Sequence, residues 1–95
     1  SAPDGIKVEV EVTSYEEALE VAAAGVDVIL LDNMAAAEMK RVAEALSGRV
    51  KLEASGGITL ENVAEVGATG VDYISIGALT HSAKNMDFSL EIASY

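Results

Sequence analysis

Three carboxylate side chains recur at a fixed interval along the sequence. Glu11, Asp32 and Glu53 are separated by 21 residues each, and each stands at or near the end of a short run rich in Val, Ile or Leu. Carboxylate oxygens bind Mg²⁺ and accept hydrogen bonds from sugar hydroxyls. Solvated strand ends are the simpler interpretation, but Asp32 closes an otherwise apolar run and Glu11 follows Glu9 on one alternating face. The pattern therefore favours Glu11 and Asp32 as ligands of Mg²⁺ or of the hydroxyls of a sugar.

Two glycine-containing loops follow the later apolar runs. Residues 55–57 (Ser-Gly-Gly) precede a segment that Thr59 can cap, and residues 77–80 (Gly-Ala-Leu-Thr) follow the next run. Glycine lets the backbone approach a ligand closely, and free amides at a helix N-terminus attract phosphate. The glycine pair alone is equally compatible with a tight turn that needs positive φ. The second loop is what favours phosphate binding, because adjacent loops of this kind hold phosphate in many barrels.

The only histidine, His81, stands beside the second loop at the start of a predicted helical turn. A single histidine is more often a surface or capping residue, but this position favours contact with phosphate or substrate. A carboxylate-bound Mg²⁺ would reconcile a phosphorylated ligand with the net charge of −10. The residues expected to bind phosphate are Ser55, Gly56, Gly57, Gly77 and His81.

The elements that must position these residues alternate between strand and helix patterns. Predicted strands span 6–12, 26–32, 50–55, 71–77 and 88–92, with helices after the first three and one helical turn at 80–85. Ser14 with Glu17 forms a capping box, and Asn33 and Thr59 are expected N-caps. The segment 25–27 (Gly-Val-Asp) recurs at 70–72, each copy opening a strand after a helix.

Parallel strands with right-handed crossovers place their carboxyl ends on one rim, where α/β barrels and open sheets carry their sites. We therefore expect an α/β fold whose consecutive βα units form a parallel half-barrel, a partial TIM-like barrel with helices on one face. Residues 1–95 would form this single domain. A rewound open sheet with helices on both faces is the alternative, and it would separate the site residues.

Composition excludes several classes of protein. The chain has 6 Lys plus Arg against 16 Asp plus Glu, which argues against binding nucleic acid or an anionic membrane. It has no cysteine and one histidine, so neither a disulfide framework nor a Cys/His zinc cluster is expected. No apolar run approaches the roughly 20 residues of a membrane span, and the first residues lack a signal-peptide pattern. A cytoplasmic protein is expected.

Four motifs together carry a resemblance to a known family. They are residues 8–12 (VEVEV), 30–34 (LLDNM), 52–58 (LEASGGI) and 76–82 (IGALTHS). In this order and spacing they resemble the C-terminal half of quinolinate phosphoribosyltransferase, also called carboxylating nicotinate-nucleotide pyrophosphorylase. The resemblance runs from about residue 6 to residue 92.

The resemblance implies a glycosyltransferase of NAD biosynthesis. Such an enzyme converts quinolinate and phosphoribosyl pyrophosphate into nicotinate mononucleotide, pyrophosphate and CO₂, with Mg²⁺. It implies that Glu11 and Asp32 hold the ribose hydroxyls and the metal-bound pyrophosphate, stabilising positive charge at the anomeric carbon. Ser55, Gly56 and Gly77 would bind the 5′-phosphate, with His81 close by.

The chain also departs from that family. Members carry an N-terminal sandwich domain and earlier barrel strands, which supply the Arg and Lys cluster that grips quinolinate, and these are absent from the 95 residues. The isolated chain is therefore expected to be inactive. A sugar-phosphate-binding βα module without transferase chemistry is one alternative. A self-associating half-barrel, completed as a homo-oligomer or by the missing N-terminal half, is another.

Overall fold

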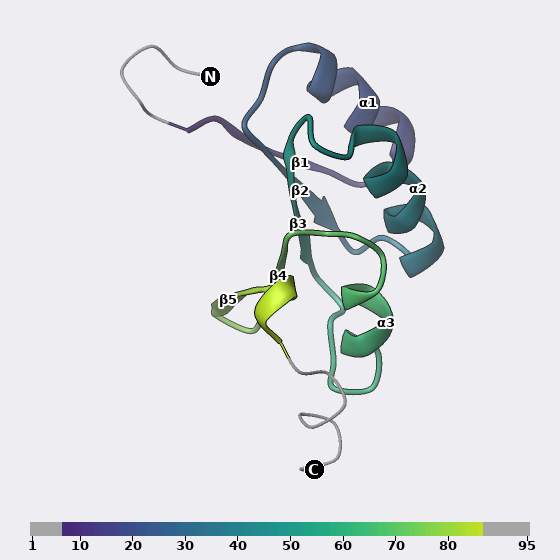
Figure 1. The fold of residues 1–95 in the computed structure, drawn as a ribbon, viewed down its shortest axis with the longest axis vertical. Coiled ribbons are helices and arrows are strands. Elements are labelled where there is room, and N and C mark those ends of the chain that lie inside the picture. Colours follow the sequence, from purple (N-terminus) through teal and green to yellow (C-terminus); the bar gives the residue numbers. More distant parts are fainter. Residues whose placement is uncertain (1–6, 87–95) are drawn as a thin grey trace.

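The computed structural model describes residues 7–86 as one sheet with helices packed against a single face (Figure 1). The elements in chain order are β1 (Glu9–Val12), α1 (Tyr15–Ala23), β2 (Val28–Asp32), α2 (Ala36–Leu46), β3 (Lys51–Ser55), α3 (Val63–Gly67), β4 (Tyr73–Ile76), β5 (Leu79–Ser82) and the 3₁₀-helix η1 (Ala83–Asn85). The predicted strand at 88–92 lies outside the described residues.

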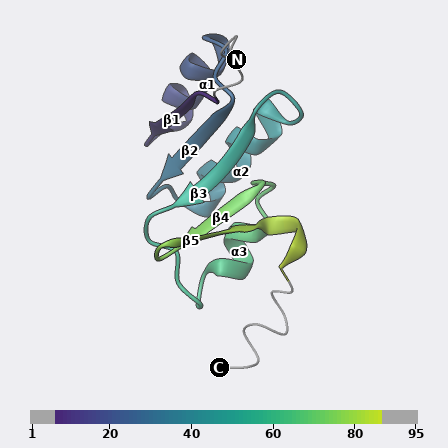
Figure 2. The ribbon, with the colours of Figure 1, turned by 90° about the vertical axis from the view of Figure 1, so that its left-hand side faces the viewer.

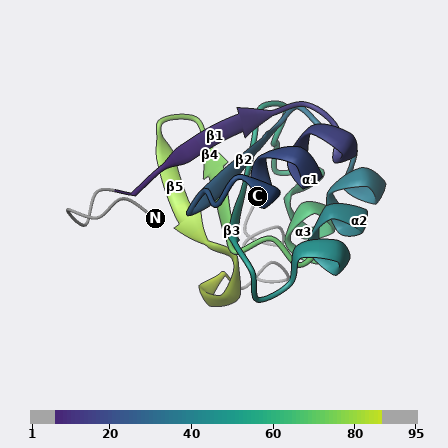
Figure 3. The same cartoon turned by 90° about the horizontal axis from the view of Figure 1, so that it is seen from above.

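The strands lie side by side in the order β1-β2-β3-β4-β5. The first four are parallel, and β5 runs antiparallel to β4. Figure 2 looks onto the face of the sheet that carries no helix, and Figure 3 shows all three α-helices on the other side. This arrangement confirms the predicted half-barrel with helices on one face. The alternative with helices on both faces is wrong.

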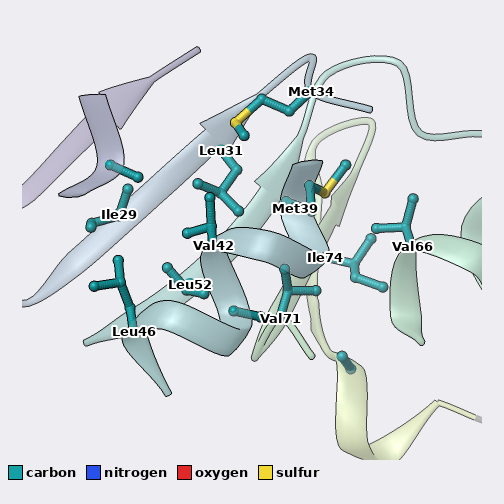
Figure 4. Close-up of a cluster of buried hydrophobic side chains, with 14 of the residues drawn as sticks. Ile29, Leu31, Met34, Met39, Val42, Leu46, Leu52, Val66, Val71 and Ile74 are labelled. Atoms are coloured by element: carbon teal, nitrogen blue, oxygen red, sulfur yellow. The ribbon is translucent and has the colours of Figure 1, made fainter. Parts of the chain in front are cut away.

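The core lies between the sheet and α2, where apolar side chains of the strands pack against the apolar face of the helix (Figure 4). Ile29 and Leu31 of β2 and Leu52 of β3 point towards the helices and are at most 2% exposed. On α2 the buried positions follow the three- and four-residue spacing of an amphipathic helix. These buried residues are Met39, Val42, Ala43 and Leu46. The opposite face of the sheet, which we call the open face, carries the polar residues of β1, β2 and β3.

The predicted caps of α1 are confirmed in detail. The Ser14 hydroxyl accepts a hydrogen bond from the Glu17 amide at 3.2 Å. The Glu17 carboxylate in turn accepts from the Thr13 amide at 2.8 Å, so the reciprocal bond falls one residue before the N-cap. Gly25 follows the helix with φ +89°, the left-handed conformation of a C-terminal cap.

Of the two other predicted N-caps, Asn33 is wrong and Thr59 caps a turn that precedes the regular helix. Ala35 is the N-cap of α2, and Asn33 instead takes φ +55° directly after β2. The Asn33 amide donates to the Ser55 carbonyl at 2.8 Å and so extends the β2–β3 ladder. The left-handed φ of Asn33 then turns the chain away from the strand. The Thr59 hydroxyl accepts from the Asn62 amide at 3.3 Å and the Thr59 amide donates to Asn62 Oδ1 at 2.8 Å, but α3 itself begins only at Val63, with Asn62 as its N-cap.

The predicted helical turn at 80–85 is also wrong over its first half. A two-residue turn at Gly77 and Ala78 joins β4 to β5, and Ile76 pairs with Leu79. Gly77 has φ +62°, as such hairpin turns require. Residues 79–82 therefore extend the sheet, and only residues 83–85 form a helical turn.

The repeated Gly-Val-Asp segment has a structural role. The Asp27 carboxylate accepts a hydrogen bond from the Val8 amide at 2.7 Å, and the Asp72 carboxylate accepts from the Leu52 amide at 2.9 Å. Each aspartate thus ties the beginning of its own strand to the preceding strand. This bonding explains why β2 and β4 begin after Asp27 and Asp72 and not at residues 26 and 71.

Candidate functional site at the carboxyl ends of the strands

The carboxyl ends of β1 to β4 lie along one edge of the sheet, at the left in Figure 2. Asp32 and Ser55 are register partners at the ends of β2 and β3. Glu11 pairs with Leu30, two residues before Asp32, so both carboxylates project from the open face of neighbouring strands. We call this edge the rim. The structure therefore places Glu11, Asp32 and Ser55 on one side of the sheet, as the sequence predicts.

Glycine is required at two positions on the rim. Gly56 and Gly57 have φ of +75° and +72°. A Cβ on Gly56 would lie 2.7 Å from Asp32 Oδ1 and 3.1 Å from the Asn33 nitrogen, and one on Gly57 would lie 2.9 Å from Asn33 Oδ1. The two loops that follow β2 and β3 are therefore in direct contact. Asp32 therefore lies against Gly56, as a site formed by both loops requires.

The glycine loop presents free hydrogen-bond donors. Within residues 7–86, the amides of Gly56, Gly57 and Ile58 donate to no protein acceptor. Successive backbone N–H groups in such a turn form a concavity that attracts anions. Gly56 and Gly57 are exposed, so their amides are accessible to a ligand. Three unpaired donors in sequence are therefore suited to the oxygens of a phosphate.

The helix contributes less to this loop than the sequence suggests. The helix α3 begins at Val63, six residues after Gly57, and the whole helix has only five residues. The predicted phosphate site at a helix N-terminus is therefore better described as a site on the loop amides. A hollow of about 410 Å³ adjoins the loop and is bordered by Asn33, Gly56, Gly57, Asn62 and Glu65 among others. Sequence reasoning assigned no ligand role to Asn33 and did not single out Asn62.

The second predicted loop is only partly brought to the site. Gly77 lies at the carboxyl end of β4 and so belongs to the same rim. His81 lies on β5, which runs back from the rim, and it pairs with Ile74. Antiparallel partners share a face of the sheet, and Ile74 is fully buried on the helix side. The structure therefore separates His81 from Asp32 and Ser55, which project from the open face.

Acidic residues dominate the open face behind the rim. Glu11 and Glu53 flank Leu30 in the same row. Burial, and to a lesser extent the nearby Glu9 carboxylate, raises the pKa of Glu53. A cation bound at this face would favour the charged form of Glu53 and so lower its pKa again.

The carboxylates at the rim are too few to hold Mg²⁺ without further ligands. Among residues 7–86 no group of three or more His, Asp or Glu side chains is placed to hold a metal ion. Mg²⁺ commonly binds proteins through one or two carboxylates and completes its shell with water and substrate phosphates. Glu11 and Asp32 fit that kind of site, in which the substrate supplies the remaining oxygens. They do not form a complete metal site by themselves.

Basic residues gather at the opposite end of the sheet. Arg49, Lys51 and Lys84 border a hollow of about 520 Å³ between the amino ends of β2, β3 and β4. Lys51 Nζ lies 4.0 Å from the Asp72 carboxylate. Arg41 stacks on the Tyr15 ring at 4.2 Å, on the helix side. No helix among the described residues is long and apolar enough to cross a membrane.

Four parallel strands with helices on one face, and candidate site residues at their carboxyl ends, correspond to part of an α/β barrel. Residues 1–91 match the family described as "Quinolinate phosphoribosyl transferase, C-terminal domain". The chain belongs to this quinolinate phosphoribosyltransferase family.

Similar proteins support this assignment. The chain is 44% identical over 87 residues to the "Probable nicotinate-nucleotide pyrophosphorylase (carboxylating)" of Bacillus subtilis, covering 92% of this chain and 30% of that protein. It is 44% identical over 90 residues to the human "Nicotinate-nucleotide pyrophosphorylase (carboxylating)", with the same coverages. The solved nicotinate-nucleotide pyrophosphorylase of Francisella tularensis superposes with a TM-score of 0.74 at 32% identity, covering 84% of this chain and 30% of that one. The chain thus spans about 30% of the length of these relatives.

Proposed function

We propose that a protein containing this chain is a carboxylating nicotinate-nucleotide pyrophosphorylase, and that this chain supplies its site for phosphoribosyl pyrophosphate. Family membership supports the reaction. The observation that carries the binding site is the contact between the Asp32 carboxylate and the loop of free amides at Gly56, Gly57 and Ile58. A sugar phosphate has the two matching ends, with hydroxyls for a carboxylate and phosphate oxygens for amides.

The proposed roles follow from this geometry. The amides of Gly56, Gly57 and Ile58 bind the 5′-phosphate, with the Ser55 hydroxyl and Gly77 at its border. Asp32 and Glu11 accept hydrogen bonds from the ribose hydroxyls on the open face. As pyrophosphate leaves, their negative charge stabilises the positive charge that develops at the anomeric carbon. Mg²⁺ bound between these carboxylates and the pyrophosphate would neutralise the leaving group.

His81 is not included in the proposed site. Its partner Ile74 is three residues before Gly77, so His81 lies roughly 10 Å back from the rim at the usual rise of a strand. Its side chain also leaves the sheet on the helix side. The sequence-based contact between His81 and phosphate would need β5 to adopt another position.

Quinolinate binding has no counterpart in the described residues. Two carboxylates on a substrate need Arg or Lys partners when they are desolvated. Arg49, Lys51 and Lys84 lie at the amino ends of the strands, away from the rim. We therefore propose that the 95-residue chain binds phosphoribosyl pyrophosphate but does not turn over quinolinate.

Calorimetry on the 95-residue chain tests the binding site. Phosphoribosyl pyrophosphate and ribose 5-phosphate are each titrated with and without Mg²⁺. We expect binding that Asp32→Asn, Glu11→Gln and Gly77→Val weaken. Glu44→Gln, which removes the same charge from an exposed position on α2, serves as the control and should bind normally. Equal affinities for all variants would disprove the site.

The same titration separates the two kinds of protein that remain. If phosphoribosyl pyrophosphate with Mg²⁺ binds no more tightly than ribose 5-phosphate, the result favours a simple sugar-phosphate module. If phosphoribosyl pyrophosphate binds more tightly and Mg²⁺ raises its affinity further, the result favours the transferase. A rate of quinolinate turnover by the isolated chain near that of its full-length relatives would contradict the proposed division of labour.

We also propose that the chain associates through the sheet. β1 and β5 are the edges of the described sheet, and open edges pair with other strands. Either a second copy or preceding barrel strands would cover β1. Sedimentation that gives a monomer at all concentrations would exclude self-association of this chain. The cytoplasmic location expected from the sequence stays a prediction.

A further inference from the structure

Asn62 holds the glycine loop through both ends of its side-chain amide. Its Nδ2 donates to the Gly57 carbonyl at 2.9 Å, and its Oδ1 accepts from the Thr59 amide at 2.8 Å. Its own backbone amide donates to the Thr59 hydroxyl at 3.3 Å. The side chain thus spans the segment between the free amides and α3.

The bond to Gly57 fixes the orientation of one peptide group. In a trans peptide the N–H points opposite to the C=O. Because the Gly57 carbonyl is drawn towards Asn62, the Ile58 amide must point away from Asn62. Gly57 has φ +72°, and a glycine can adopt several other backbone conformations about as readily. A single acceptor–donor bond therefore selects one of these arrangements.

The geometry points to Asn62 as a positioning residue for phosphate: it holds the Gly57–Ile58 peptide so that the free amides converge before the ligand arrives. This inference rests on the proposed phosphate site. A loop that is ordered beforehand loses less conformational freedom on binding, so affinity rises without any new contact to the ligand. Asn62 itself need not touch the phosphate.

Two substitutions at Asn62 separate loop positioning from support of α3. Asn62→Ala removes both side-chain bonds. Asn62→Asp keeps an oxygen that accepts from the Thr59 amide but cannot donate to the Gly57 carbonyl. Asn85→Ala, an exposed asparagine on η1, is the matched control.

The measurements are made on the 95-residue chain with ribose 5-phosphate and with ribose as the probe without phosphate. We expect both Asn62 variants to raise the Kd for ribose 5-phosphate by about three- to tenfold, the range set by one ordinary hydrogen bond. Any weak binding of ribose should be unchanged. Asn62→Asp should keep the wild-type unfolding midpoint, and Asn85→Ala should match the wild type throughout.

Amide NMR spectra show whether the effect acts where it is proposed. Ribose 5-phosphate should shift the Gly56, Gly57 and Ile58 amides of the wild type, and these signals should broaden in the free Asn62 variants. If the wild type shows no such shift, the phosphate site itself is wrong. If the wild type shifts and both variants bind as tightly, only the role of Asn62 is wrong. Loss of affinity in Asn62→Ala together with normal affinity in Asn62→Asp would also overturn it.

Discussion

The close approach of Gly56 to Asp32 predicts that Gly56→Ala loses ligand affinity without an exceptional loss of stability. Gly48 provides the control, because both glycines have φ +75°. A Cβ on Gly48 would meet nothing within 4 Å, whereas one on Gly56 would lie 2.7 Å from Asp32 Oδ1. The two substitutions therefore share a backbone penalty, and only the one at Gly56 adds contacts, with Asp32 Oδ1 and, at 3.1 Å, with the Asn33 backbone nitrogen.

The magnitudes follow from that comparison. An L-residue in the left-handed region costs about 1–2 kcal/mol, and both variants should lose that much free energy of unfolding. The closer contact at Gly56 falls on the end of a side chain, so the Asp32 carboxylate can rotate away, whereas the Asn33 backbone nitrogen must shift slightly, which adds a further cost in stability. Rotation breaks its hydrogen bond to ribose, which is worth about 1.5–3 kcal/mol when one partner is charged. Affinity should fall roughly tenfold to a hundredfold.

Urea unfolding and calorimetry measure the two effects on the same samples. Gly48→Ala should match the wild type in its affinity for phosphoribosyl pyrophosphate with Mg²⁺. Gly56→Ala should be less stable than Gly48→Ala only by the cost of relieving the contact with the Asn33 backbone nitrogen. Normal affinity in Gly56→Ala would refute the proposed role of Asp32. Equal affinity losses in both variants would show that the binding defect comes from a looser fold.

Three further predictions concern stability. Burial raises the pKa of Glu53, so its ionisation opposes folding as pH rises above its ordinary 4.5; Glu53→Gln should unfold at higher urea than the wild type at pH 7, and this advantage should vanish below pH 4.5. Hydrogen bonds from Thr13 lower the pKa of Glu17, so the stability that Glu17 provides is present above pH 4.5 and lost as pH falls. The difference in urea unfolding between wild type and Glu17→Gln should therefore be largest above pH 4.5 and shrink as pH falls below it. Leu52→Ala should cost about 2–5 kcal/mol by the same method, because Leu52 is 2% exposed between neighbouring strands; a loss under about 1 kcal/mol would contradict the packing.

Local patterns were sufficient for most of the elements. Alternation in β1 and the three- and four-residue spacing in α2 predicted which faces are buried, because a strand and a helix each have one fixed period. The Ser14–Glu17 box predicted the beginning of α1, because its bonds join residues only three or four apart. The 21-residue spacing predicted that strand ends share an edge, because regular βα units repeat the same geometry.

Local patterns failed where a distant segment competes for the same groups. Asn33 was predicted as an N-cap, but its amide bonds to Ser55, which is 22 residues away in the sequence. Residues 80–82 were predicted as helical, but β4 offers them an open edge with which to pair. In both places the outcome depends on a neighbouring strand whose position no short stretch of sequence specifies.

The chain's chemistry was thus readable from its residues, namely carboxylates at strand ends and a glycine pair able to take positive φ. Their place on a common rim was predicted as well, but the contacts between them were not. The contact of Gly56 with Asp32, the grip of Asn62 on Gly57 and the removal of His81 to the other side of the sheet all depend on packing between segments far apart in sequence. Residue type sets what a side chain can do, whereas long-range pairing sets which side chains meet.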